Sequence, residues 1–345
     1  MPKLPQNPRV LFIQTAFIGD AVLLSSMVRT WRKHRPDSIC EVLVRKGNGA
    51  MFADHPDVAQ VHEWDKSGKG RNRRLWQLLK AIRARNFDVV FNAHRHLSSG
   101  ALTAGSGAKY RVGYRANPLS KFFTHRVLHE IGDGRHEAER LVDLLRAVEP
   151  NLALSKPLNP RLFPDQSAVE EAEGAIAGLD RSFVLLAPGS QWFTKQWPTA
   201  RWRQLVELLE ADGRTVVLFG GPAEAETLRA CLPESSSARM ITHLSLMGAY
   251  ALVERASVVV TNDSAPLHWA SGANTPTLAV FCSTVPAFGF GPMADRSAIF
   301  ESMELLTCRP CGLHGHKACP QGHFRCGDVD AKSLALTIRK WSAEA

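Results

Sequence analysis

The segment Ser257–Pro286 constrains the fold most strongly, because it predicts a strand, a capped helix and a second strand in succession. Val258–Val260 is an apolar, β-branched run that is too short and too abruptly ended for a helix. The helix-capping residue types of Thr261–Ser264 follow it, and a helix should run from there to about Gly272–Asn274. Thr277–Phe281 is the next apolar run. Strand, helix and strand in this order form the unit of a parallel α/β sheet, which binds ligands at the carboxyl ends of its strands.

The start of this predicted helix is a candidate anion site. Pro266 falls in the first helical turn, where a missing N–H costs no intrahelical hydrogen bond. The remaining free N–H groups and the positive end of the helix dipole favour a phosphate or another anion. Asp263 and His268 are about one turn apart, so both side chains can face the same ligand. Taken alone, the stretch is explained equally well by a capped helix with a surface histidine.

Strands and helices alternate in both halves of the chain. In the first half, the buried run Arg9–Gln14 leads through Gly19-Asp20 into an amphipathic helix. The segment Pro150–Pro164 is rich in proline, has no clear periodicity and is the best candidate for a linker. The pattern then restarts, which predicts two parallel-sheet domains of residues 1–165 and 166–327. The last segment, 328–345, contains a predicted helix over about Ala331–Trp341.

Charge and hydropathy narrow the classes of function. The 345 residues carry 42 Lys and Arg against 33 Asp and Glu, a net charge of +9, which favours anionic partners. The chain has no recognisable nucleic-acid motif, so we expect an anionic lipid or a phosphorylated substrate and no nucleic acid. No apolar run approaches the ~18 residues of a membrane span, and the N-terminus lacks the pattern of a signal peptide. We therefore expect a cytoplasmic protein.

Two basic stretches stand out in the first half. Asp65–Arg74 is polar, punctuated by glycine and strongly basic, and is either a phosphate- or membrane-binding loop or a solvated one. After the predicted strand Asp88–Asn92, three basic side chains and two hydroxyls follow directly. Because such side chains are unusual packing material, we expect a binding loop there. Its candidate acceptor-binding residues are His94, Arg95, His96 and Ser98.

Four loops at the carboxyl ends of predicted strands form a specific combination. They are Phe17–Asp20, Pro188–Pro198, Phe219–Glu224 and Asn262–His268. Together they resemble the ADP-heptose:lipopolysaccharide heptosyltransferases, which are inverting glycosyltransferases of the GT-B fold with two Rossmann-like domains. The resemblance extends over nearly the whole chain. It is strongest in the second half, where the patterns P-G-S-x4-K-x-W-P and N-D-S-x3-H occur together.

The resemblance implies roles for individual residues. Asp20 matches the general base of the family, which suits the need of an attacking hydroxyl for a proton acceptor. A diphosphate leaving group needs cations and N–H donors. The residues that match donor and phosphate contacts are Ser190, Lys195, Glu224, Asn262, Asp263, Ser264 and His268, with Glu224 placed toward the ribose.

The resemblance also implies the partners. We expect an ADP-heptose donor, an anionic glycolipid acceptor from the lipopolysaccharide core, and peripheral contact with the inner face of the cytoplasmic membrane. The implied reaction requires no cofactor. In GT-B proteins a terminal helix crosses back to the first domain, and we expect residues 328–345 to do the same.

A cluster of cysteines near the C-terminus leaves two interpretations open. Seven cysteines are an odd number, and four of them crowd one region, which argues for a local cluster and against a disulfide scaffold. These four, with histidines between them, have ligand-like spacing, so a structural zinc ion and a loop packed by reduced thiols both fit. They are Cys308, Cys311, Cys319 and Cys326.

Two alternative functions accompany the heptosyltransferase hypothesis. The first is a GT-B transferase that uses another nucleotide sugar, because the residues that contact the base cannot be identified from the sequence. The second is a zinc-bearing basic protein that binds anions without chemistry.

Overall fold

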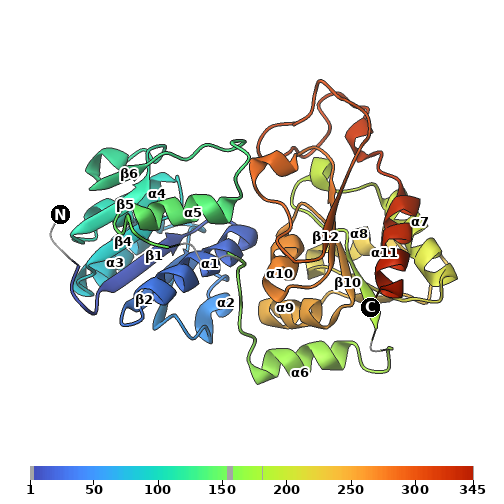
Figure 1. Ribbon diagram of the computed structural model, residues 1–345, viewed down its shortest axis with the longest axis horizontal. Coiled ribbons are helices and arrows are strands. Elements are labelled where there is room, and N and C mark those ends of the chain that lie inside the picture. Colours follow the sequence, from blue (N-terminus) through green and yellow to red (C-terminus); the bar gives the residue numbers. More distant parts are fainter. Residues whose placement is uncertain (1–3, 154–157, 181, 345) are drawn as a thin grey trace. The chain divides into compact units, whose positions relative to one another are not determined.

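The computed structural model describes residues 4–153, 158–180 and 182–344, and its chain divides into two units (Figure 1). Unit 1 comprises Met1–Ile131 and Arg135–Phe163, and unit 2 comprises Gly132–Gly134 and Pro164–Ala345. The main boundary, after Phe163, lies within the segment that the sequence suggested as a linker. Residues 154–157 of that segment, which include Pro157, lie outside the described residues.

Unit 1 is built on a six-stranded parallel sheet in the order β3-β2-β1-β4-β5-β6. Its strands are β1 (Arg9–Gln14), β2 (Ile39–Arg45), β3 (Gln60–Trp64), β4 (Val89–Asn92), β5 (Tyr110–Tyr114) and β6 (His125–Val127). Its helices are α1 (Ile18–His34), α2 (Ala50–Ala53), α3 (Arg71–Ala84), α4 (Leu97–Gly105) and α5 (Glu137–Arg146).

Alternating side chains of the central strands fill a separate core on each face of this sheet. Leu11 and Ile13 of β1 lie in the cluster that α3 and α4 cover. Phe12, which points to the other face, stacks on Phe91 of β4, and Trp31 of α1 packs edge-on against the same ring. Helix α5 lies beside α1 on that face. The result is three layers, with helices on both sides of the sheet.

Unit 2 repeats this plan with the order β12-β11-β10-β7-β8-β9. Its strands are β7 (Phe183–Ala187), β8 (Thr215–Phe219), β9 (Arg239–Ile241), β10 (Val258–Asn262), β11 (Thr277–Phe281) and β12 (Ser297–Glu301). Its helices are α6 (Gln166–Ala175), α7 (Thr199–Ala211), α8 (Ala225–Ala230), α9 (Leu246–Arg255), α10 (Ala265–Ala273) and α11 (Ala331–Ala343). Helix α9 packs against α6 and α10, whereas α7 packs against α8 and α11.

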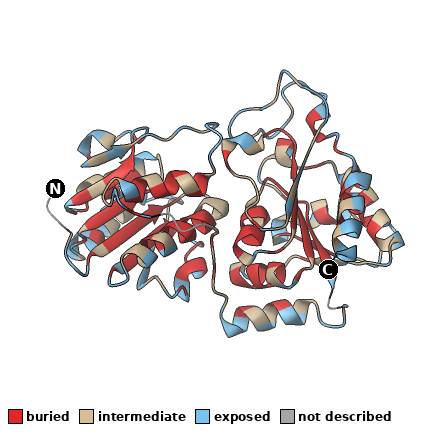
Figure 2. Cartoon of the chain, viewed as in Figure 1, coloured by how far each residue is buried: buried red, intermediate tan, exposed pale blue. Residues whose placement is uncertain are grey.

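The central strands of both sheets are buried along their length (Figure 2). Strands β7, β10 and β11 contain no exposed residue, which explains their near-continuous apolar sequences, because helices cover both faces of a parallel sheet. The predicted α/β fold with two Rossmann-like domains is confirmed.

The two sheets share one topology. If strands are numbered from the first strand of each unit, both orders read 3-2-1-4-5-6. Such a sheet has a topological switch point, where neighbouring connections run to opposite faces and leave a crevice at the carboxyl ends. This point lies between β1 and β4 in unit 1 and between β7 and β10 in unit 2.

The C-terminal helix does not follow the expectation that it belongs with the first domain. Leu334 and Ile338 of α11 are fully buried in the core of unit 2, in the same cluster as residues of α7. The segment before the helix is fixed there as well, because the Trp197 indole N–H donates to the carbonyl of Val329 over 3.2 Å. Among the described residues, no helix of either unit has the length and apolar character needed to cross a membrane.

Candidate active site

The loops at the switch point of unit 2 are joined by Asn262, the last residue of β10. Its side-chain Nδ2 donates to the carbonyl of Pro188 over 2.6 Å, and its Oδ1 accepts from the backbone N–H of Trp197 over 3.0 Å. The side chain is fully buried. The sequence placed Asn262 among donor-binding residues; the structure shows it fixing both ends of the Pro188–Pro198 loop against β10.

Lys195 and Asp263 form a largely buried ion pair at the carboxyl ends of the strands of unit 2. Lys195 Nζ lies 2.6 Å from Asp263 Oδ2, and the two side chains are 14% and 9% exposed. The same carboxylate oxygen accepts from Thr284 Oγ1 over 2.6 Å. An ammonium group has three N–H donors, so Lys195 retains donors for a further anion after pairing with Asp263. We name Lys195, Asp263 and Thr284 the lysine cluster.

Glu224 lies directly above the glycine of the Pro188–Pro198 loop. A Cβ at Gly189 would collide with the Glu224 carboxylate, so a side chain at this position would displace Glu224. The other oxygen, Oε2, accepts from the backbone N–H of Gly221 over 2.8 Å. Ser190 follows the glycine and is partly exposed, and its carbonyl accepts from Gln196 Nε2 over 2.7 Å. The structure thus brings Ser190 and Glu224 to the same edge.

The predicted helix after β10 is present as α10, from Ala265 to Ala273, with Ser264 as its N-cap and Asn274 in the left-handed conformation at its end. Ser264 Oγ lies 3.3 Å from Thr261 Oγ1. His268 is only 5% exposed, and its ring packs edge-on against Phe290. The interpretation of His268 as a surface histidine is therefore wrong.

The cysteine-rich segment is attached to the same edge by Arg309, which the sequence analysis missed. The Arg309 guanidinium donates to the carbonyls of Phe281 (3.1 Å), Cys282 (2.6 Å) and Thr284 (2.7 Å), at the end of β11. It also pairs with Glu301 of β12. An arginine next to Cys308 is the only sequence signal for this contact, and it does not identify partners so distant along the chain.

The structure brings the four cysteines of the C-terminal segment together. Among the described residues, no group of three or more His, Cys, Asp or Glu side chains is positioned to hold a metal ion. All four cysteines line one small cavity with His323 and Arg309. Burial raises the pKa of Cys326 to about 11.

The switch point of unit 1 carries the predicted base. Asp20 is the third residue of α1, and its Oδ2 accepts from the backbone N–H of Phe17 over 3.2 Å. Phe17 is the N-cap of this helix, so Asp20 is not itself the cap. The carboxylate is partly exposed.

The loop between β1 and α1 is held by groups from two other loops. His94 Nδ1 lies 3.0 Å from Thr15 Oγ1, and Lys66 Nζ donates to the carbonyl of Thr15 over 2.6 Å. Burial, together with the nearby charges of Lys66, His96 and Arg95, lowers the pKa of His94 to about 3. His94 is therefore neutral near pH 7. Lys66, which also approaches Asp20's loop, was not singled out by the sequence analysis.

The loop with the predicted acceptor-binding residues has a defined conformation. The rings of His94 and His96 stack with their centroids 5.3 Å apart. Ser99 Oγ donates to the carbonyls of His94 and His96 over 3.0 and 2.9 Å, and Asn117 Nδ2 donates to the same two carbonyls over 3.1 and 3.0 Å. Arg95 and Ser98 are partly exposed beside them. The sequence selected Ser98, but the buried Ser99 is the serine that fixes this loop.

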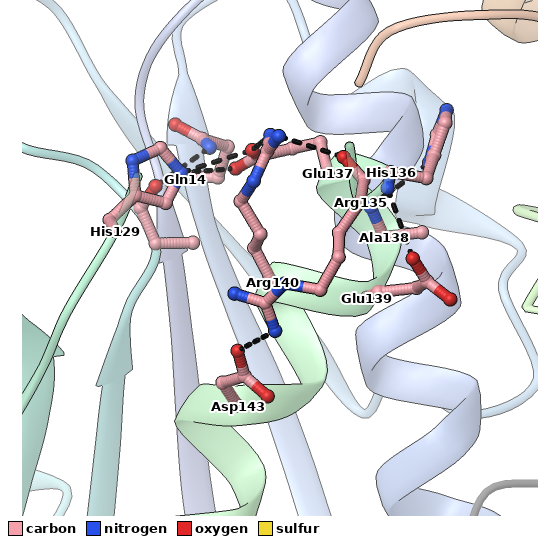
Figure 3. Close-up of polar contacts among 10 residues, drawn as sticks. Gln14, His129, Arg135, His136, Glu137, Ala138, Glu139, Arg140 and Asp143 are labelled. Carbon is pink, nitrogen blue, oxygen red and sulfur yellow. Dashed lines mark hydrogen bonds and ion pairs between the residues drawn. The ribbon is translucent and has the colours of Figure 1, made fainter. Parts of the chain in front are cut away.

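A buried polar network completes this edge of unit 1 (Figure 3). His129 Nε2 lies 3.0 Å from both carboxylate oxygens of Glu137, and Arg140 Nη1 donates to Glu137 Oε2 over 2.9 Å. Burial alone would raise the pKa of Glu137, but the contacts with His129 and Arg140 outweigh it and lower the pKa. Figure 3 shows Gln14, at the end of β1, beside this group. The network joins the first turn of α5 to His129 in the segment after β6.

Comparison with known proteins agrees with this geometry. The family model "Glycosyltransferase family 9 (heptosyltransferase)" matches residues 75–317. Lipopolysaccharide heptosyltransferase 1 of Pseudomonas aeruginosa is 28% identical over 318 residues, which cover 88% of this chain and 86% of that protein. Lipopolysaccharide heptosyltransferase 3 of Escherichia coli K12 is 24% identical over 295 residues, covering 78% and 81%.

Solved structures share the fold. The family 9 glycosyl transferase of Veillonella parvula has a TM-score of 0.86 at 19% identity, covering 99% of each chain. ADP-heptose lps heptosyltransferase II of E. coli has a TM-score of 0.78 at 21% identity, covering 98% of this chain and 100% of that chain. The family consists of enzymes, which sets aside the alternative of a non-catalytic anion-binding protein. The chain belongs to glycosyltransferase family 9, the heptosyltransferases.

Proposed function

We propose that this protein transfers a heptose from ADP-heptose to an acceptor sugar of the lipopolysaccharide core, with inversion at the anomeric carbon. The observation that carries this function is the lysine cluster at the switch point of unit 2, where a cation stands beside a glycine loop and a helix start. The names of the relatives support the choice of sugar and acceptor, since they are lipopolysaccharide heptosyltransferases. The E. coli heptosyltransferase WaaC, which shares the fold, has been solved with ADP.

Unit 2 binds the donor in this scheme. Lys195 and the free N–H groups at the start of α10 neutralise the diphosphate as it leaves, and Ser190 adds a hydroxyl donor. His268 and Ser264 border the same site. Asp263 orients Lys195, because a carboxylate placed directly against a diphosphate would repel it. Glu224, fixed above Gly189, accepts from the ribose hydroxyls.

Unit 1 supplies the base. The acceptor oxygen attacks the anomeric carbon from the face opposite the diphosphate, and the bond between that carbon and the leaving oxygen breaks. ADP departs with the bonding electrons, and the hydroxyl proton passes to the Asp20 carboxylate. This single displacement inverts the configuration. Side chains and N–H groups of the protein offset the charge that develops on the leaving diphosphate, so we expect the reaction to require no cofactor.

The acceptor contacts belong to the loops around Asp20. In this scheme Arg95 meets the anionic groups of a glycolipid, with His96 and Lys66 nearby, and the neutral His94 offers hydrogen bonds only. We further propose that the protein is cytoplasmic and contacts the inner face of the cytoplasmic membrane, where such an acceptor is anchored.

A donor panel tests this function. The protein is incubated with a lipopolysaccharide core acceptor and with ADP-heptose, UDP-sugars or GDP-sugars in turn, and nucleotide release and the anomeric configuration of the product are measured. We expect release from ADP-heptose and a product of inverted configuration. Transfer from a UDP- or GDP-sugar in preference to ADP-heptose would identify the alternative donor, and retention of configuration would contradict the single displacement.

A further inference from the structure

The segment from Lys66 to Arg85, which contains α3, carries many cations and no carboxylate. Its cations are Lys66, Lys69, Arg71, Arg73, Arg74, Lys80, Arg83 and Arg85. Three of them have partners within unit 1: Lys66 donates to Thr15, Arg74 to backbone carbonyls of its own loop, and Arg85 to Glu41. Neither the catalytic scheme nor the packing of the fold accounts for the others.

The geometry of α3 arranges these other cations along one side. Leu75, Leu78, Leu79 and Ile82 contact the core beneath the helix, which fixes its inward face. Arg73, Trp76, Lys80 and Arg83 recur at spacings of i, i+3, i+7 and i+10, so they lie along one stripe of the helix surface. All four are exposed. We name these four residues the basic stripe.

Trp76 sets this stripe apart from an ordinary solvated face. Its side chain is 72% exposed, whereas Trp31, Trp64, Trp197 and Trp202 are at most 1% exposed. Among the described residues, the remaining tryptophans are buried or half-buried. A large aromatic ring in water is unfavourable, and a ring with one polar N–H is suited to the boundary between water and an apolar phase.

The cations of the stripe are not neutralised by any described residue. Across the described parts of both units, Arg73, Lys80 and Arg83 form no ion pair. Lys80 and Arg83 are three residues apart, so their like charges repel on the same side of the helix. An anionic partner would relieve this repulsion.

We propose that the basic stripe docks on a bilayer that contains anionic phospholipids, with Trp76 inserted at the level of the headgroups. Cations on one side of a helix, an aromatic residue among them and the absence of carboxylates are complementary to such a surface. This inference rests on the proposed function in one respect: an acceptor anchored in the membrane gives the docking a use, because it keeps the enzyme at the surface where its substrate lies.

Vesicle binding by the whole protein tests the docking. Vesicles of phosphatidylcholine alone and of phosphatidylcholine with phosphatidylglycerol are sedimented with the wild type, with Arg73→Gln/Lys80→Gln/Arg83→Gln and with Trp76→Ala. We expect wild-type binding only to the anionic vesicles, weakened by salt. The triple variant should bind about 100-fold more weakly, since each cation at an anionic surface contributes several-fold. The variant Trp76→Ala should bind more weakly but keep the salt dependence.

A matched variant controls for total charge. Arg229→Gln/Lys332→Gln/Lys340→Gln removes the same charge from exposed positions of unit 2 and should bind like the wild type. A second measurement locates the tryptophan: brominated lipids should quench the wild type more than Trp76→Phe. An equal loss of binding in both triple variants, equal quenching in both proteins, or no wild-type binding to anionic vesicles would overturn the docking surface. Binding to single-stranded nucleic acid that depends on the stripe and is as strong as binding to anionic vesicles would also overturn it.

Activity separates this inference from the proposed function. The triple variant of the stripe should transfer sugar to a deacylated, soluble acceptor at the wild-type rate and lose rate only with an acceptor embedded in vesicles. Vesicle binding without any sugar transfer would refute the function and leave the docking surface standing. Transfer that is equal for both acceptors in all variants would refute the docking and leave the function.

Discussion

At the scale of single residues, Lys195 is the group whose chemistry is best defined by its surroundings. Its ammonium is paired with Asp263 on one side and largely shielded from water, so it is held in place before any substrate binds. A cation that is already oriented loses little entropy when a phosphate approaches. Thr284, on the same carboxylate oxygen, fixes the position of Asp263 in turn.

Replacing Lys195 should therefore affect phosphate contacts selectively. We expect Lys195→Ala to weaken ADP binding by about 10- to 100-fold, since a charge-assisted hydrogen bond contributes roughly 1.5–3 kcal/mol. Adenosine binding should change little. Calorimetry with both ligands measures the difference, and Lys340→Ala, at an exposed position of α11, is the control. An equal loss for ADP and adenosine would show that the variant had disturbed the fold of the loop.

The lowered pKa of His94 predicts how the stability of the folded protein depends on pH. The pKa of its ring is lowered from 6.5 to about 3 by burial and by neighbouring cations, so the unfolded chain binds the proton more readily. Stability should therefore be unaffected by His94 above about pH 6.5 and fall as the pH drops from there toward 3. Urea unfolding of the wild type and of His94→Gln at several pH values tests this. The variant should lose less stability over that range, and a difference independent of pH would contradict a neutral, buried His94.

At the scale of elements, the cysteine-rich segment braces the end of β11. The Arg309 guanidinium donates hydrogen bonds to three carbonyls there. One of these carbonyls belongs to Thr284 of the lysine cluster. The same segment contacts the Pro188–Pro198 loop, where the His316 N–H donates to Thr194 Oγ1 over 2.8 Å. The segment thus supports the lysine cluster and the Pro188–Pro198 loop, our proposed donor site, through hydrogen bonds from its own residues.

We predict that Arg309 acts as a positioning residue. The variant Arg309→Met should raise the KM for the nucleotide sugar by about tenfold, because the end of β11 and Thr284 lose their fixed donors. Arg309→Lys should restore this only in part, since an ammonium lacks the planar fork that reaches several carbonyls. Arg325→Met, which breaks an exposed ion pair with Glu304 in the same segment, is the control. An unchanged KM in Arg309→Met would show that the hydrogen bonds of Arg309 do not affect binding of the nucleotide sugar.

Local patterns predicted some of these elements well. The strand, cap and helix around Ser264 follow from apolar runs and capping residues, and the structure has α10 from Ala265 to Ala273. Contacts between distant residues could not be derived in this way. Nothing local to Arg309 identifies carbonyls 25 to 28 residues earlier as its partners. The apolar stripe of α11 shows that the helix packs on a sheet, but it fits either sheet, which is why its placement was wrong.

The sequence also does not show which residues of a motif are buried and which are accessible to a ligand. Asn262 and Asp263 are neighbours in one motif, yet Asn262 is fully buried and bonded to the Pro188–Pro198 loop, whereas Asp263 pairs with Lys195. A motif identifies the group of residues but not which of them reach a ligand. The same limit explains why Ser98 was chosen over Ser99.

At the scale of the whole molecule, two sheets of one topology carry different chemistry at equivalent places. The switch point of unit 2 has a cation, a glycine loop and a helix start, which suit a nucleotide diphosphate. The switch point of unit 1 has a carboxylate and basic loops, which suit a hydroxyl nucleophile on an anionic acceptor. We propose that binding of the donor and activation of the acceptor are divided between the two units in this way.

The variant Asp20→Asn tests this division most directly, through kcat and the affinity for ADP measured on the same protein. Asparagine keeps an oxygen that accepts from the Phe17 N–H, so α1 retains its first turn while the proton acceptor is lost. We predict that kcat falls by about 10²- to 10⁴-fold, as for removal of a general base, while the Kd for ADP stays within twofold of the wild type. Turnover close to that of the wild type would contradict the assignment of Asp20 as the base.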